Sequence, residues 1–130
     1  QVYWYDLLAK ENGETLAMLR NRAADKALLL RFNKSELPAF TQWKNTASEA
    51  DGYVTGLEPA TDYPNAKSFE RQRGRLLQLG PGESHTVHMS LHVLASGKEV
   101  GAAQAEIDAL QEGVERVVHG EPIGKYTDLG

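Results

Sequence analysis

The sequence predicts a mainly β protein: an antiparallel β-sandwich, or part of one, with one helix late in the chain. About seven short runs of strand-forming residues are separated by connections of hairpin length. These runs do not alternate with helical patterns, so parallel βαβ units are not expected. Only after residue 97 do the apolar residues change from alternation to helical spacing.

The first four predicted strands cover residues 2–8, 15–20, 27–33 and 39–44. An Asn-Gly pair at 12–13 lies between the first two runs, and this pair between apolar runs is the strongest short hairpin signal. Polar turn residues and a Leu-Pro step separate the later runs. The N-terminal part is therefore expected to form antiparallel hairpins.

A fifth strand is expected over residues 52–58. It ends at Glu58, because Pro59 has no backbone N–H to donate and restricts the residue before it to extended backbone. Residues 68–73 predict one turn of helix, and residues 75–79 predict a short sixth strand.

The run from 86 to 93 alternates strictly, which predicts one buried face and one exposed face. Its apolar face carries Val87, Met89, Leu91 and Val93, and its polar face carries Thr86, His88, Ser90 and His92.

Residues 98–112 form the predicted helix, with Val100, Ala103, Ile107 and Leu110 on one side and Gly113 after its end. This helix is expected to cap a sheet edge or to pack on a partner subunit. Residues 1–112 are then one β-rich unit, and 113–130 form an extended tail.

Composition excludes several classes of partner. The net charge of −4 gives no electrostatic reason to bind nucleic acid or an anionic membrane. The chain has no cysteine, which excludes disulfides and thiolate metal sites. The apolar run 27–30 is too short to span a bilayer, no signal-peptide pattern opens the chain, and we expect a cytoplasmic protein.

Glu58 is the strongest candidate for chemistry. A carboxylate held on a rigid strand is aimed by the backbone, which suits a general base. The alternative from pattern alone is that Glu58-Pro59 only ends a strand and has no chemical role.

The stretch GLEPATDYPNA at residues 56–66 resembles a motif of the aldose 1-epimerases, or galactose mutarotases. Their motif reads Leu-Glu-Thr-Gln, two variable residues, then Pro-Asp-Ala. Its glutamate is their catalytic base and matches Glu58, and Pro64-Asn-Ala matches their proline step. The wider run from Leu30 to Glu83 resembles an uncharacterised bacterial branch of this superfamily, and the resemblance covers most of residues 1–112.

The resemblance implies that the chain is the C-terminal portion of a mutarotase-like β-sandwich. It also implies that the intact protein interconverts the anomers of a sugar or sugar derivative by general acid/base catalysis, without a cofactor. Two departures are evident. Pro59-Ala60 replaces the usual Thr-Gln, and the family's acid histidine lies upstream of the glutamate, whereas His85, His88, His92 and His119 all lie downstream. We therefore expect this chain, which starts at Gln1, to be inactive alone and to need the N-terminal remainder of the same protein or a second subunit.

The candidate sugar-binding residues are Trp43 and Lys44, on the strand before Glu58, Asn45, directly after that strand, and Asp62 and Asn65, on the loop after Glu58. An indole offers an apolar platform to a sugar, and an ammonium or amide can donate to hydroxyls. A half-buried indole, a solvated lysine and ordinary turn chemistry are the alternatives for these positions.

No metal site is expected, because His88 and His92 are about 13 Å apart along an extended strand. Arg71, Arg73 and Arg75 could bind a phosphate or carboxylate, or could line a solvated edge strand. The alternative function is a non-catalytic carbohydrate-binding or structural β-sandwich domain.

Overall fold

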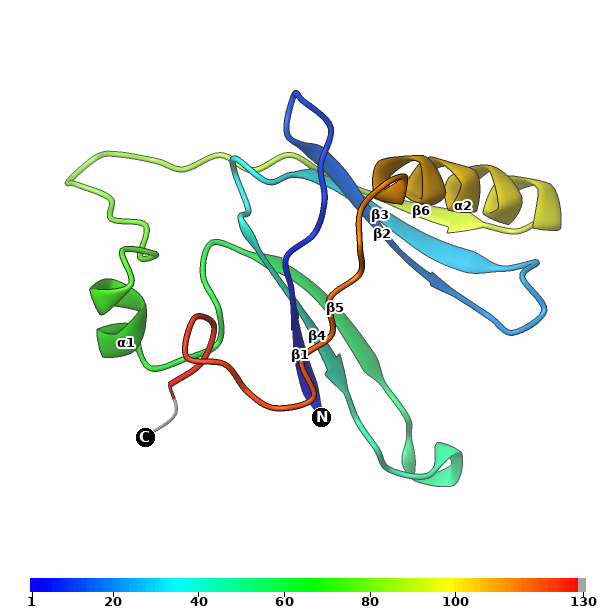
Figure 1. Ribbon diagram of the computed structural model, residues 1–130, viewed down its shortest axis with the longest axis horizontal. Helices are drawn as coiled ribbons and strands as arrows, with labels where there is room; N and C mark the ends of the chain where they lie inside the picture. Colours follow the sequence, from blue (N-terminus) through cyan, green and yellow to red (C-terminus); the bar gives the residue numbers. More distant parts are fainter. Residues whose placement is uncertain (129–130) are drawn as a thin grey trace. The chain divides into compact units, whose positions relative to one another are not determined.

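The computed structural model describes residues 1–128 as two compact units that interleave along the chain. The first unit contains residues 1–7, 37–86 and the chain from Val118 onward. The second contains residues 8–36 and 87–117. Each unit is built on one three-stranded antiparallel sheet, so the predicted mainly antiparallel β architecture with a C-terminal helix is confirmed (Figure 1).

The sheet of the first unit has the strand order β1-β4-β5. It consists of β1 (Val2–Tyr5), β4 (Ala39–Lys44) and β5 (Thr55–Ala60). The short 3₁₀ helix η1 (Glu49–Asp51) lies between β4 and β5, and α1 (Lys67–Gln72) follows β5. Phe40, Tyr63 and Phe69 are buried in this unit, and the Tyr5 ring meets Phe40 edge-on at 5.9 Å.

The sheet of the second unit has the order β2-β3-β6. It consists of β2 (Glu14–Arg20), β3 (Ala27–Asn33) and β6 (Met89–Leu94), followed by α2 (Gly97–Gln111). Leu16, Leu29 and Ala103 form its core, against which Met18, Leu94, Ile107 and Leu110 pack. These contacts bury one face of the sheet against α2 and drive the association of helix and sheet.

Local signals place the boundaries of the second unit. Gly13 adopts a φ of 84° in the turn before β2, as expected of an Asn-Gly turn. The predicted hairpin between the first two strands is wrong, because β1 ends at Tyr5 and pairs with β4, whereas β2 pairs with β3. The Ser96 hydroxyl accepts from the Glu99 N–H, while the Glu99 carboxylate accepts from Ser96 Oγ and the Ala95 N–H. This reciprocal capping starts α2 at Gly97, within one residue of the predicted position.

The predicted strand at 75–79 is wrong, so six strands lie within residues 1–128. Gly74 and Gly82 both have positive φ, and no described strand pairs with the segment between them. The single helical turn expected at 68–73 is present as α1. In the predicted tail, residues 114–119 have no regular structure, Tyr126 N–H donates to Ile123, and residues 129–130 lie outside the described range.

The predicted burial of one face of β6 is wrong. Met89, Leu91 and Val93 are 56, 58 and 77% exposed. The alternation itself is correct, but His92 pairs with Leu29, on the face that packs against α2, so the polar face of β6 lies on the helix side. Ser90 and His92 on that polar face are exposed as well, so neither face of β6 is covered before Leu94. Alternation shows that a strand has two unlike faces, but burial depends on the neighbouring elements.

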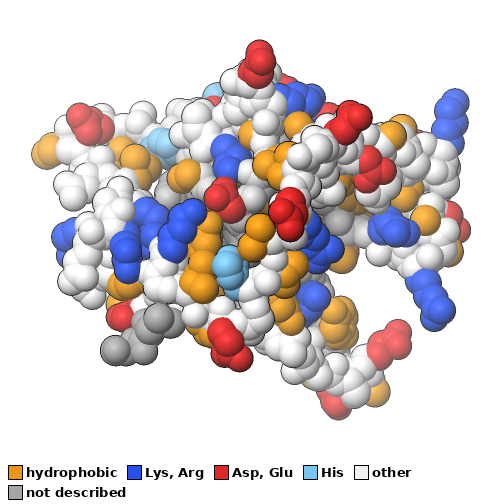
Figure 2. Space-filling model, viewed as in Figure 1, with side chains coloured by type: hydrophobic (Ala, Val, Ile, Leu, Met, Phe, Trp, Pro, Cys, Tyr) orange, Lys and Arg blue, Asp and Glu red, His pale blue; other side chains and the backbone are white. Residues whose placement is uncertain are grey.

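No helix within residues 1–128 has both the length and the apolar character needed to cross a bilayer. On the face of the protein seen in Figure 2, acidic, basic and apolar side chains are interspersed.

Candidate functional site

Glu58 lies inside β5, which continues through Ala60, so the prediction that the strand ends at Glu58 is wrong. Pro59 keeps its place in the ladder opposite Phe40. Because β5 is an edge strand in the order β1-β4-β5, no strand within residues 1–128 lies on the other side of Pro59 to need a donated N–H. The backbone on both sides of Glu58 is therefore held by strand pairing.

The strand register defines the face on which Glu58 lies. Trp4 pairs with Thr41 and Thr41 pairs with Glu58, so these three residues form one row across β1, β4 and β5. In the adjacent row on the same face, Trp43 pairs with Gly56. Directly paired residues of antiparallel strands project from the same side of the sheet.

The Glu58 carboxylate is exposed and lies over Gly56, in the space that a β-carbon at that position would occupy. It makes no hydrogen bond or ion pair with any of residues 1–128. An exposed, unpartnered carboxylate on a fixed strand can accept a proton from a ligand, although among residues 1–128 Glu58 is open to water.

Trp43 is 41% exposed and projects from the same face as Glu58, so the structure brings these two candidates together. Lys44 is separated from them. It projects from the opposite face, where its Nζ lies 4.9 Å from the centroid of the Tyr3 ring. Adjacent residues on a strand point to opposite sides, so Trp43 and Lys44 cannot both line one cleft on this sheet.

Asn45 is engaged in its own hairpin. Its side-chain amide donates to the Gly52 carbonyl at 3.3 Å, and its side-chain oxygen accepts from the Ala47 N–H at 3.0 Å. Both polar groups close the connection between β4 and β5, which leaves Asn45 with a structural role in this arrangement.

The loop after β5 is anchored by its own polar groups. The Asn65 amide donates to Glu70 Oε1 at 2.7 Å and to the Tyr126 carbonyl at 2.8 Å. Tyr63 is buried, with its ring edge-on to Tyr126 at 5.4 Å. Asp62 is half-buried on the same loop. Asn65 therefore fixes the loop that follows the Glu58 strand.

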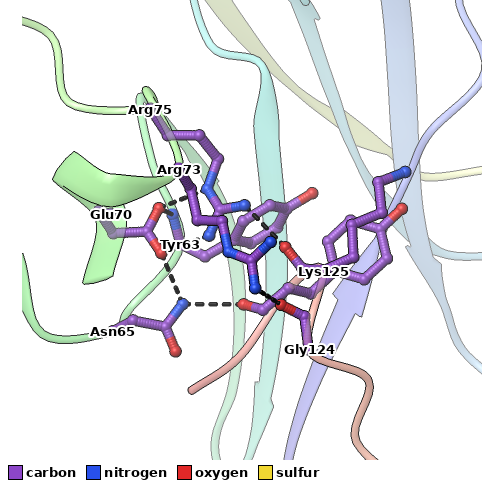
Figure 3. A network of polar contacts seen from close by, with 8 residues as sticks. Tyr63, Asn65, Glu70, Arg73, Arg75, Gly124 and Lys125 are labelled. Atoms are coloured by element: carbon purple, nitrogen blue, oxygen red, sulfur yellow. Dashed lines mark hydrogen bonds and ion pairs between the residues drawn. The ribbon is translucent and has the colours of Figure 1, made fainter. Parts of the chain in front are cut away.

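The carboxylate of Glu70 is the centre of a polar network drawn in Figure 3. Glu70 is 1% exposed and accepts two hydrogen bonds from the Arg75 guanidinium, both at 2.6 Å. These bonds from Arg75 hold the pKa of Glu70 below its usual range. Arg75 also donates to the Lys125 carbonyl and Arg73 to the Gly124 carbonyl, so both arginines tie the C-terminal segment to α1.

This network corrects the interpretation of the arginine cluster as an edge strand or anion site. Arg73 and Arg75 are committed to carbonyls and to Glu70, and Arg75 also lies 5.4 Å from the centroid of the Tyr63 ring. Sequence reasoning missed Glu70, because its partners at 65, 75 and 126 are brought together only by the loop. An acidic residue in a short exposed-looking helix carries no local signal of burial.

Two further polar atoms were not predicted from the sequence. Trp4 Nε1 and Thr41 Oγ1 are buried and have no hydrogen-bond partner within residues 1–128. Both side chains lie in the row that contains Glu58. Such groups are uncommon in folded proteins, because burial removes their hydrogen bonds to water.

A pocket of about 410 Å³ lies elsewhere, within the second unit, and contains none of the predicted site residues. Its charged side chains are already paired. Arg31 binds Glu106 through two hydrogen bonds, at 2.8 and 2.6 Å, Lys10 lies 3.1 Å from Glu106, and His88 lies 2.9 Å from Glu36. We therefore place the candidate site on the Glu58 face of the first sheet.

Comparison with a solved structure defines the class of protein. A crystal structure of a "putative aldose 1-epimerase" from Klebsiella pneumoniae subsp. pneumoniae MGH 78578 matches with a TM-score of 0.82 and 37% sequence identity over 88% of this chain. The resemblance to the aldose 1-epimerases is thereby confirmed, and the chain spans about 30% of the length of that relative.

The chain's own family follows from a family model. The model, described as a domain of unknown function, DUF4432, matches residues 1–93, and the chain belongs to this family. No curated protein matches the chain.

Proposed function

We propose that this chain carries the base-bearing part of an enzyme that interconverts the anomers of a monosaccharide or sugar derivative, with Glu58 as the general base. The observation behind this proposal is the Glu58 carboxylate: it lies in the motif that resembles the aldose 1-epimerases, is held inside β5, and is exposed without a partner among the described residues. The similarity to the Klebsiella protein supports the same class of reaction.

The chemistry requires a base and an acid. Glu58 takes the proton of the anomeric hydroxyl, the electron pair of that oxygen forms the C1 carbonyl, and the bond from C1 to the ring oxygen breaks. The ring oxygen takes a proton from a general acid. Rotation about C1–C2 then presents the other carbonyl face, and the reverse steps close the ring with inverted C1.

The acid is expected outside this chain. All four histidines follow Glu58 in sequence, whereas the family's acid precedes the glutamate. His88 lies beside Glu36 and His92 beside Ser90, all in the second unit. The chain alone is therefore expected to be inactive, and the partner is the remainder of the protein or a second subunit.

Trp43 is the proposed platform for the apolar face of the sugar, since it shares a sheet face with Glu58. Asp62, on the loop that Asn65 anchors, is the second proposed contact. Lys44 and Asn45 are left out of this proposal, because one projects from the opposite face and the other closes its hairpin.

The test is two-dimensional NMR exchange between the α and β anomers of D-glucose and D-galactose, measured on the full-length protein. Glu58→Gln is expected to lower the catalysed exchange rate by about 10²–10⁴-fold, the usual contribution of one acid/base group. Glu49→Gln, an exposed carboxylate in η1, is the matched control and should leave the rate unchanged. An unchanged rate in Glu58→Gln would refute the assignment of the base.

The second candidate function is a carbohydrate-binding domain without catalysis. The location of all histidines in this chain after Glu58 favours it. The same experiment separates the two functions, because a binder broadens the sugar resonances but gives no catalysed exchange cross-peaks.

A further inference from the structure

We propose that Thr41 and Trp4 bind hydroxyl groups of an uncharged pyranose in the row that ends at Glu58; this inference rests on the proposed function and names the substrate class of that site. The row crosses three strands, with Trp4 on β1, Thr41 on β4 and Glu58 on β5.

The spacing of the row suits a single ring. Neighbouring strands are about 4.8 Å apart, so the backbones of Trp4 and Glu58 are about 10 Å apart with Thr41 midway. Polar groups at these intervals can contact hydroxyls on different carbons of one pyranose. On β5 itself, Gly56 and Ala60 flank Glu58 on this face, and the Glu58 carboxylate lies over Gly56.

Thr41 gives the strongest indication of a ligand. The residue is 2% exposed, and its hydroxyl has no partner within residues 1–128. A valine would fill nearly the same volume and suit a strand equally well, without leaving a buried hydroxyl unpaired. The indole N–H of Trp4 lies in the next position of the row and is also buried without a partner within residues 1–128. Packing alone would not require a polar group at either position.

The chemical types in the row point to hydroxyl groups. An indole N–H only donates, a threonine hydroxyl donates and accepts, and a carboxylate only accepts. Hydroxyls both donate and accept, so one ring can satisfy all three groups at once. Because Thr41 Oγ1 is buried, a neighbouring side chain has to move when the sugar binds.

The charge of this face argues against an anionic sugar. On β1, β4 and β5 the residues that share the face are Val2, Trp4, Ala39, Thr41, Trp43, Gly56, Glu58 and Ala60. Glu58 supplies their only charge, and Lys44 projects from the other side. A sugar phosphate would meet a carboxylate and no cation on this face of the three strands, which makes a neutral sugar the better ligand.

The test is titration of the full-length protein with D-glucose, D-galactose and glucose 6-phosphate by NMR, with thermal unfolding measured in parallel. Thr41→Val is expected to weaken binding of the neutral sugar about 2- to 12-fold, the value of one hydrogen bond, while leaving the Tm equal or higher. Thr41→Ser, which keeps the hydroxyl, should bind like the wild type. Trp4→Phe is the second variant and should weaken binding by a similar factor.

The outcomes distinguish this inference from the proposed function. Wild-type affinity in both Thr41→Val and Trp4→Phe, with catalysed anomer exchange intact, overturns the inference alone. Tighter binding of glucose 6-phosphate than of glucose overturns the neutral substrate class. If none of the three compounds binds the wild type, the inference and the proposed function both fall.

Discussion

The Glu58 carboxylate occupies the space that a β-carbon on Gly56 would fill. The two residues are two positions apart on β5 and project from the same face. The position of the candidate base is therefore set in part by the absence of a side chain at residue 56.

Gly56→Ala is expected to displace the Glu58 carboxylate and to lower catalysed anomer exchange while leaving the fold intact. Gly56 does not have a positive φ, so alanine fits its backbone, and the atoms it would meet are the mobile end of a side chain. The stability should be unchanged or higher by up to about 1 kcal/mol, because alanine restricts the unfolded chain.

Gly101→Ala is the matched control for this change. It lies in α2 of the second unit, and a β-carbon there would meet nothing within 4 Å. Exchange measured by NMR should separate the two variants, and unfolding in urea checks that both remain folded. Equal exchange rates in both would show that the placement of Glu58 over Gly56 does not matter to the reaction.

The pH dependence of stability is expected to come in part from Glu106. The hydrogen bonds from Arg31, together with those from Lys10, hold the pKa of Glu106 at about 2, against an ordinary value of 4.5. A carboxyl whose pKa is lower in the folded state contributes stability that is complete above the unfolded pKa and is lost as the pH falls toward the folded one. The contribution should therefore disappear between about pH 5 and pH 2.

Glu106→Gln tests this assignment through the free energy of unfolding. The variant should be less stable than the wild type at pH 6, and the difference should shrink steadily as the pH is lowered to 2. Glu112→Gln, an exposed carboxyl at the end of α2, serves as the control and should match the wild type throughout. A Glu106→Gln difference that is constant with pH would exclude the ion pair as its cause.

Local sequence patterns correctly predicted the strands and the helix whose boundaries depend on nearby residues. The strands at 27–33 and 39–44 agree with β3 and β4 residue for residue, and Ser96 with Glu99 starts α2 where the change of period predicts. Each of these boundaries depends on residues within a few positions of one another, so a short window of sequence is enough to predict it.

The sequence predictions are wrong where the structure depends on residues that are distant in the sequence. Pro59 was expected to end its strand, but its place on the outermost strand of the sheet makes the missing N–H harmless, and edge position depends on topology. The exposure of both faces of β6 depends on which elements pack beside it, and the burial of Glu70 depends on Arg75 and the chain near residue 126. None of these relationships is expressed in a short window of sequence.

Trp43 and Lys44 were grouped in one cleft although strand alternation already separates them. Trp43→Ala is expected to weaken binding of a neutral sugar about 2- to 12-fold, the range for an aromatic contact of about 0.5–1.5 kcal/mol, because the indole shares a face with Glu58. Lys44→Ala should leave the affinity unchanged, because its ammonium lies over Tyr3 on the opposite face.

The two residues are adjacent on β4 and both variants truncate a long side chain to alanine, so the face of the sheet is a main difference between them. Titration of the full-length protein with D-galactose by saturation-transfer NMR measures both affinities under one condition. Weaker binding in Lys44→Ala than in Trp43→Ala would place the sugar on the Tyr3 face, away from Glu58. In that case the carboxylate could not reach the anomeric oxygen, and the role of Glu58 as the base would fail with the location of the site.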